Sequence, residues 1–311
     1  MITVEGLTHY YGDRRAIEGL SFQIAANECV GFLGLNGAGK STTLKVLAGL
    51  VVPTAGSVSI DGVDLVASTA ESRARIGYLP EDPPLYREMT VREFVQYCGE
   101  LKGMSAADVR GRMDEVLALC QLTHVAGRVI GELSHGYKKR CGIAQAIIHA
   151  PKLVVLDEPI SGLDPKQIVE MRQVIRDLAK RCTVLISSHI LAEISETCDR
   201  ILVLNGGRIV ASGTEEELAR AATASGTQLT LVLRGNGDDV QALIAKVVSL
   251  RSFKAVNEPE GLVRVHLTMA EDQREAVVAA LVAGGIGIRK MMEDESELET
   301  MFLALTKEAV A

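Results

Sequence analysis

Short apolar runs rich in β-branched residues alternate with helix-like stretches from the start of the chain to about residue 220. Four such runs stand out, at 29–33, 153–156, 184–187 and 201–204. Uninterrupted apolar runs of this length are typical of parallel strands covered by helices, because neither face of such a strand meets water. The pattern therefore predicts an α/β domain built on a largely parallel sheet.

Between about residues 90 and 150 the pattern becomes almost entirely helical. Apolar residues such as Val109, Met113 and Val116 recur at spacings of three and four, which is the period of one helix face. This region predicts a helical insert within the α/β domain.

A second region follows a small, polar stretch at 221–227, which has no apolar periodicity and predicts a linker. We place the domain boundary there. Residues 1–221 are then expected to form the α/β domain, and residues 222–311 an accessory domain.

The accessory region combines strand-like and helix-like patterns in the order βαββαβ. The predicted strands are 228–233, 253–256, 262–267 and 286–290, and the predicted helices are 239–250 and 271–283. This order is that of the ferredoxin-like arrangement, in which two βαβ halves form one antiparallel sheet with helices on one face. A last helix is predicted to begin at Ser296, where Ser296 and Glu299 fit a capping box.

Composition and charge exclude several classes of protein. Of the 311 residues, 47% are apolar and 23% charged, which excludes disorder as the dominant state. The formal net charge of −7 argues against a broad nucleic-acid-binding surface. No apolar run reaches the ~18–20 residues that a membrane-spanning helix needs, and the first residues lack the features of a secretory signal. The six cysteines form no Cys-x-x-Cys pair. We therefore expect a cytoplasmic chain that does not cross a membrane by itself.

The strongest chemical signal is Gly34-Leu-Asn-Gly-Ala-Gly-Lys40-Ser41, which fits G-x-x-x-x-G-K-[ST] between an apolar strand and a helical run. Glycines let this phosphate loop wrap tightly, so that backbone N–H groups and the helix N-terminus point at phosphate oxygens. Lys40 can then reach the β- and γ-phosphates, and the Ser41 hydroxyl can bind magnesium. The predicted ATP-binding residues of the loop are Gly34, Asn36, Gly37, Ala38, Gly39, Lys40, Ser41 and Thr42.

A buried strand at 153–156 ends in two carboxylates, Asp157 and Glu158. On their own they would fit a solvated strand end. Beside a phosphate loop, an Asp at the carboxyl end of a strand lies next to the magnesium ion, as phosphoryl transfer requires. Asp157 is therefore predicted to bind Mg²⁺, and Glu158 to act as the general base that activates water.

Together these motifs resemble the ATP-binding subunits of ABC transporters, over about residues 2 to 220. The resemblance implies that Tyr11 stacks on adenine, that Asp164 belongs to the family's D-loop, and that His189 is its switch histidine. In this family the histidine contacts the γ-phosphate and holds the water and Glu158 in register.

The chain departs from the family pattern at two motifs. Leu133-Ser-His-Gly-Tyr137 stands where the signature is usually Leu-Ser-Gly-Gly-Gln. Ser134 and Gly136 remain, and they can offer a hydroxyl and a backbone N–H to a γ-phosphate. Glu81 replaces the usual glutamine of the Q-loop, and its carboxylate is expected to bind the metal or to raise its own pKa beside the other carboxylates.

The resemblance implies an ATPase coupled to transmembrane transport, with ATP and Mg²⁺ as cofactors. Two copies would close head-to-tail, each ATP lying between Lys40 of one copy and Ser134 of the other. The work would pass to separate transmembrane permease subunits at the cytoplasmic face of the membrane, through the helical insert and the loop 81–89. The variant motifs are similar to those of exporter ATPases of gliding-motility and drug or antibiotic efflux systems.

Two alternatives remain open at this point. One is an importer ATPase with a regulatory tail. The other is a soluble ABC protein that acts on ribosomes or DNA, although such proteins generally carry two cassettes or a long coiled-coil insert.

Overall fold

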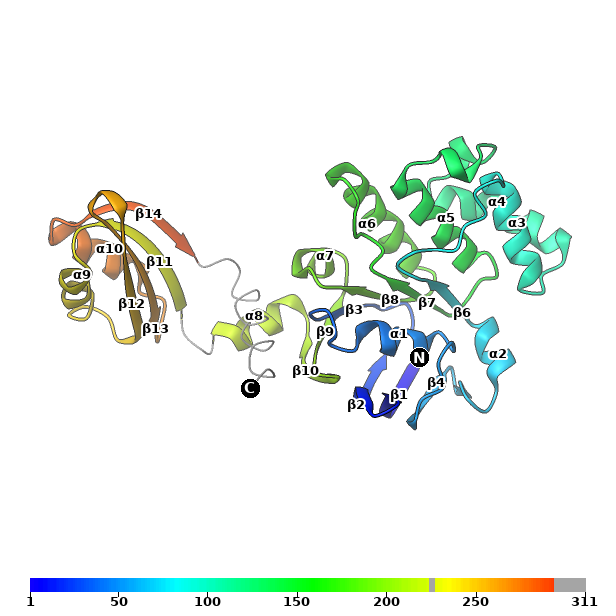
Figure 1. Ribbon diagram of the computed structural model, residues 1–311, viewed down its shortest axis with the longest axis horizontal. Helices are drawn as coiled ribbons and strands as arrows, with labels where there is room; N and C mark the ends of the chain where they lie inside the picture. The colour runs from blue at the N-terminus through cyan, green and yellow to red at the C-terminus, as the bar shows by residue number, and fades with distance from the viewer. Residues whose placement is uncertain (224–226, 294–311) are drawn as a thin grey trace. The chain divides into compact units, whose positions relative to one another are not determined.

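The computed structural model describes residues 1–223 and 227–293 of the chain (Figure 1). The chain forms two compact units, which divide between Thr214 and Glu215. The boundary predicted at 221/222 lies inside the helix α8 (Glu215–Thr223), so the units of the structure divide at the start of that helix.

The first unit contains a four-stranded sheet in the order β2-β1-β4-β5, whose neighbouring strands are all antiparallel. Its strands are β1 (Ile2–Tyr11), β2 (Arg14–Ile24), β4 (Ala55–Ile60) and β5 (Val63–Asp64). The β1–β2 pairing shifts register at three points, so the side-chain alternation along both strands is interrupted.

A six-stranded sheet in the order β10-β9-β3-β8-β7-β6 forms the centre of the unit. Its strands are β3 (Cys29–Leu33), β6 (Ile76–Leu79), β7 (Leu153–Asp157), β8 (Thr183–Ser188), β9 (Arg200–Asn205) and β10 (Arg208–Gly213). All pairs are parallel except β9–β10. Every residue of β3, β7 and β8 is buried, as strands covered on both faces require. The predicted α/β class with a largely parallel sheet is confirmed.

Helices cover this sheet, and the first of them connects it to the antiparallel sheet. Leu44 and Leu47 of α1 (Lys40–Leu47) belong to one apolar core with residues from both sheets. Phe22 and Phe32 meet edge to face at 5.4 Å between ring centroids in the same core. The other helices at the sheet are α2 (Thr69–Ala74), α6 (Pro165–Ala179) and α7 (Leu191–Ser195).

Three helices and two short 3₁₀ turns occupy the range predicted as a helical insert, between β6 and β7 in the chain. They are α3 (Val91–Leu101), α4 (Ala106–Leu119), η1 (Thr123–Val125), η2 (Ile130–Glu132) and α5 (His135–Ile147). The last of them lies directly on β6: a Cβ at Gly77 would be 2.1 Å from the Ala146 carbonyl oxygen, and one at Gly142 would be 2.4 Å from Leu79. Glycines at these contacts let α5 approach the sheet edge closely, which brings its first turns beside the segment after β6.

The second unit contains, after α8, a βαββαβ element order. The elements are β11 (Thr227–Arg234), α9 (Gly237–Ile244), β12 (Leu250–Glu258), η3 (Pro259–Gly261), β13 (Leu262–Met269), α10 (Arg274–Ala283) and β14 (Gly287–Glu293). The strand order is β12-β13-β11-β14, and every neighbouring pair is antiparallel.

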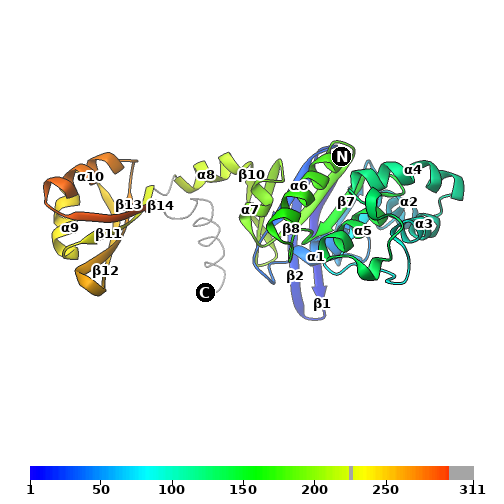
Figure 2. The same cartoon turned by 90° about the horizontal axis from the view of Figure 1, so that it is seen from above.

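Both α9 and α10 contribute to one apolar core with the sheet, and the two helices lie on the same face of it (Figures 1 and 2). We interpret this topology as the ferredoxin-like arrangement. The helix predicted to begin at Ser296 lies outside the described residues. In the described part of the chain, no helix is both long enough and apolar enough to cross a membrane.

Candidate functional site

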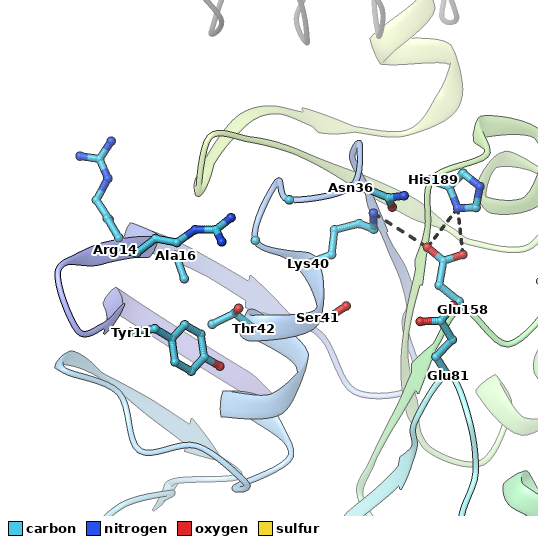
Figure 3. Close-up of a pocket in the computed structure, with 13 residues that line it drawn as sticks. Tyr11, Arg14, Ala16, Asn36, Lys40, Ser41, Thr42, Glu81, Glu158 and His189 are labelled. Atoms are coloured by element: carbon cyan, nitrogen blue, oxygen red, sulfur yellow. Dashed lines mark hydrogen bonds and ion pairs between the residues drawn. The ribbon is translucent and has the colours of Figure 1, made fainter.

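A cavity of about 430 Å³ lies at the carboxyl ends of four parallel strands (Figure 3). Asn36, Glu81, Glu158 and His189 line it and follow β3, β6, β7 and β8 in turn. The opposite wall comes from the end of β1, which contributes Tyr11, and from the start of β2. The parallel sheet thus collects side chains from distant parts of the sequence at one edge.

The phosphate loop wraps around the start of α1. Gly37 and Gly39 have φ values of +86° and +103°, which other residue types rarely adopt. A Cβ at Gly39 would also lie 2.8 Å from the Ala16 carbonyl oxygen, so a side chain there would push the loop away from β2. Of the predicted loop residues, six line the cavity, whereas Gly34 and Ala38 are buried behind it; the six are Asn36, Gly37, Gly39, Lys40, Ser41 and Thr42.

Lys40 is buried, and its ammonium donates hydrogen bonds to the carbonyl oxygens of Gly34 (2.6 Å) and Leu35 (3.4 Å). Its Nζ lies 3.9 Å from Oε1 of Glu158. Burial lowers the pKa of Lys40, while the charges of Glu158 and Asp157 oppose that change. A cation held in the loop in this way is suited to bind phosphate oxygens.

Asp157 and Ser41 form an oxygen-rich corner at the end of β7. Ser41 Oγ lies 3.4 Å from Asp157 Oδ1, and the Ser187 hydroxyl donates to the same oxygen at 2.7 Å. Figure 3 shows Glu81 and Ser41 pointing into the same part of the cavity. Among the described residues, no three His, Cys, Asp or Glu side chains cluster as a metal site. These oxygens nevertheless fit Mg²⁺, which takes few protein ligands and completes its coordination with phosphates and water.

Glu158 is held from several sides. Its φ of +47° is unusual for a residue with a Cβ, and its N–H donates to Ser187 Oγ at 3.0 Å. His189 Nδ1 lies 3.2 Å from both carboxylate oxygens. Burial raises the pKa of Glu158, and the hydrogen bond and charge of His189 oppose this, as does Lys40. A carboxylate whose pKa is raised is better suited to accept a proton from water.

The signature residues and Asp164 do not line the cavity. Ser134 is the N-cap of α5, and Asp164 is the N-cap of α6, where its carboxylate accepts the N–H of Gln167 at 2.9 Å. The Gln167 side chain also packs against Gly136. The structure therefore brings Gly136 and Asp164 together around Gln167, in a group separate from the cavity.

Four residues of the site were not identified from the sequence. Arg14, Arg15 and Ala16 line the cavity from the start of β2, and Ser187 connects Asp157 to the backbone of Glu158. No sequence motif identified Ser187, because its place beside Asp157 follows from the parallel register of β7 and β8, in which the two residues are partners. For the two arginines no motif was available.

Comparisons with known proteins place the chain in a family. The family model described as ABC transporter matches residues 17–161. The chain is 32% identical to the bacitracin transport ATP-binding protein BcrA of Bacillus licheniformis, over 98% of this chain and 97% of that protein. It is 34% identical to the Nod factor export ATP-binding protein I of Rhizobium sp. (strain N33), over 98% and 96%.

A solved structure extends the comparison to the first unit. It is a dimeric ATP-binding cassette in a post-hydrolysis state bound to ADP and Pi, with a TM-score of 0.61 and 26% identity over 69% of this chain and 98% of that one. The phosphate loop, the carboxylates after β7 and the similarity over nearly the whole length lead to one conclusion. The chain belongs to the ABC transporter family, as one of its ATP-binding and ATP-hydrolysing proteins.

Proposed function

We propose that this chain is the ATPase subunit of an exporter, working as a head-to-tail dimer on separate transmembrane subunits. The observation that carries the direction of transport is the whole-length similarity to relatives named for bacitracin transport and Nod factor export. That similarity includes the second unit and therefore extends beyond the ATP-binding core.

In this proposal the cavity holds the nucleotide. Tyr11 is exposed and stacks on the adenine, the phosphate loop binds the phosphates through its N–H groups, and Lys40 neutralises the β- and γ-phosphates. Mg²⁺, held by Ser41, Asp157 and Glu81, supplies charge neutralisation of the phosphates when bound.

Glu158 and His189 act on the attacking water. Glu158 accepts the proton of the water as the water oxygen bonds to the γ-phosphorus, while the bond from that phosphorus to the bridging oxygen breaks and ADP leaves. His189 keeps the carboxylate oriented through its Nδ1 contact. The product state loses the γ-phosphate contacts, which releases the closed form of the dimer.

We propose a dimer because the phosphate loop and the signature residues lie in different places within one chain. Lys40 lines the cavity, whereas Ser134 and Gly136 lie at the start of α5 and are not among the residues that line it. In a head-to-tail pair, the N-terminus of α5 in one copy faces the phosphates in the other, where its N–H groups stabilise negative charge. Asp164, next to Gly136 around Gln167, joins the same interface.

We propose that the membrane subunits dock on the helical insert and the loop 81–89, at the cytoplasmic face of the membrane. In this region Tyr86 is 44% exposed and packs against Phe94 and Tyr97, with ring centroids 6.2 and 5.4 Å away. An exposed aromatic residue supported by a buried one is a common anchor of protein interfaces.

The test of the proposed function is reconstitution with membrane subunits. The chain should co-purify with a polytopic membrane protein, and in proteoliposomes that complex should move substrate away from the side that carries the ATPase. ATP turnover of the complex should exceed that of the isolated chain by about tenfold or more, because coupled subunits favour the closed state. Movement toward the ATPase side, or recovery only on ribosomes, would contradict the exporter proposal.

A separate prediction concerns Glu81. Glu81→Gln removes one charged oxygen ligand, and we expect the Mg²⁺ concentration for half-maximal ATPase activity to rise roughly tenfold. ATP binding without added metal should not change. The matched control is Asp82→Asn, which removes the neighbouring exposed carboxylate outside the cavity lining and should leave the Mg²⁺ midpoint unaltered. An unchanged midpoint in Glu81→Gln would show that Glu81 is not a metal ligand.

A further inference from the structure

Lys139 is a buried lysine of α5 that the reaction described above does not use. Its side chain is among the largest of those fully buried, and the residue is only 2% exposed. Its ammonium donates hydrogen bonds to two main-chain carbonyl oxygens, that of Glu158 at 3.1 Å and that of Glu81. One cation thus joins three segments that are far apart in the sequence: α5, the segment after β6, and the end of β7.

The hydrogen bond to the carbonyl oxygen of Glu158 bears on the backbone conformation of that residue. Glu158 has a φ of +47°, and a residue with a Cβ keeps this conformation only when its surroundings hold it there. Ser187 Oγ accepts the Glu158 N–H at 3.0 Å, and Lys139 Nζ binds the carbonyl oxygen of the same residue. The backbone of Glu158 is therefore fixed on both sides of its Cα, and this sets the direction of its side chain.

The charges around Lys139 explain why a buried ammonium is tolerated there. Burial lowers the pKa of Lys139, and Glu81, Asp82, Glu158 and Asp157 oppose this through their negative charges. These negative charges partly offset the cost of burying the ammonium, while the atoms that it binds are backbone oxygens.

We propose that Lys139 is a positioning residue for ATP hydrolysis: it holds the backbone of Glu158 so that the carboxylate faces the attacking water, and it links that backbone to Glu81. This inference rests on the proposed role of Glu158 as the general base. Lys139 does not line the cavity, and it binds the backbone of Glu158 rather than the carboxylate. Replacing Lys139 should therefore slow the chemical step and leave nucleotide binding unchanged.

The first test separates kcat from KM. Lys139→Met keeps the aliphatic stem and removes the ammonium, so kcat should fall roughly 10- to 100-fold, as a displacement of about 1 Å at the base would cause. KM for ATP, and the Kd of a fluorescent ATP analogue, should change less than about threefold. Lys139→Arg keeps cationic donors and should recover most of kcat. The matched control is Lys138→Met, because Lys138 Nζ binds the Gly131 carbonyl oxygen at 3.2 Å and touches neither glutamate; its kcat should stay within about twofold.

The second test asks whether Lys139 acts through Glu158. If it does, adding Lys139→Met to Glu158→Gln should lower kcat little further, since the carboxylate that Lys139 positions is already absent. Slow turnover in both backgrounds is measured with enzyme in excess over ATP. Thermal melting and nucleotide binding verify folding, and Lys139→Gln replaces Lys139→Met if the latter does not fold.

The outcomes separate this inference from the proposed function. If Glu158→Gln retains full turnover, the general-base assignment fails, and this inference fails with it. If Glu158→Gln is inactive while Lys139→Met and Lys139→Gln keep normal kcat, only the role of Lys139 is overturned. Equal losses in kcat and in nucleotide binding, without recovery in Lys139→Arg, would also overturn it, because they would mark Lys139 as a structural residue.

Discussion

Glu158→Gln is expected to lower ATP turnover at least ~100-fold, because a neutral amide cannot take the proton of the attacking water. ATP binding should stay within about threefold, since glutamine has nearly the same size and the phosphate loop is untouched. The buried carboxylate also lies 3.9 Å from Lys40, so its neutralisation leaves the ammonium free to bind phosphate.

The same substitution should trap a closed dimer. With hydrolysis blocked, the γ-phosphate contacts persist, and size-exclusion chromatography with ATP and Mg²⁺ should show a dimer that wild-type protein forms only transiently. Glu193→Gln is the matched control: Glu193 is as buried as Glu158, at 7% exposure, but it accepts a hydrogen bond from Ser188 outside the cavity lining. Normal turnover in Glu158→Gln, together with a monomer, would overturn the assignment of the base.

The sequence pattern predicted those strands whose apolar residues are contiguous in the chain. The buried strands β3, β7 and β8 contain short apolar runs rich in β-branched residues, and runs of this length are typical of strands and too short for most helices. The antiparallel sheet of β1, β2 and β4 was not predicted. Its pairing shifts register several times, so the alternation that identifies a half-buried strand is interrupted.

The linker predicted at 221–227 differs from the structure at its first three residues. Residues 221–223 belong to α8, and their small side chains were interpreted as loop-like. Alanine has the highest intrinsic helix propensity, so a run of alanines without apolar periodicity can continue a helix.

The residues of the candidate site also fall into two groups, those that a contiguous sequence motif identifies and those that it does not. The phosphate loop and the pair Asp157 and Glu158 could be found because each is contiguous in the sequence and follows a strand. Ser187 and Lys139 could not, because their partners lie far away in the chain and depend on strand register and on how closely α5 approaches β6. In the sequence alone, Lys139 is one of several cations on a helix and predicts only a solvated face.

The proposed head-to-tail dimer predicts recovery of activity by mixing two inactive variants. Lys40→Ala removes the phosphate-binding cation, and Ser134→Arg places a bulky charge where the signature faces the nucleotide of the other copy. Each variant alone should lose about 100-fold in turnover or more. In an equal mixture, about half of the dimers carry one copy of each, and in these one site has both Lys40 and Ser134 intact.

The mixture should therefore regain up to about a quarter of wild-type turnover, provided that one complete site suffices. Differently tagged copies, captured together in the presence of ATP, verify that mixed dimers form. The control mixture pairs Lys40→Ala with the double variant Lys40→Ala/Ser134→Arg, which contains no complete site in any combination and should stay inactive. If captured mixed dimers show no recovery, Lys40 and Ser134 do not act on the same nucleotide. If Ser134→Arg alone keeps wild-type turnover, each chain hydrolyses ATP without the signature of its partner, because the phosphate loop and Glu158 of one copy would then suffice.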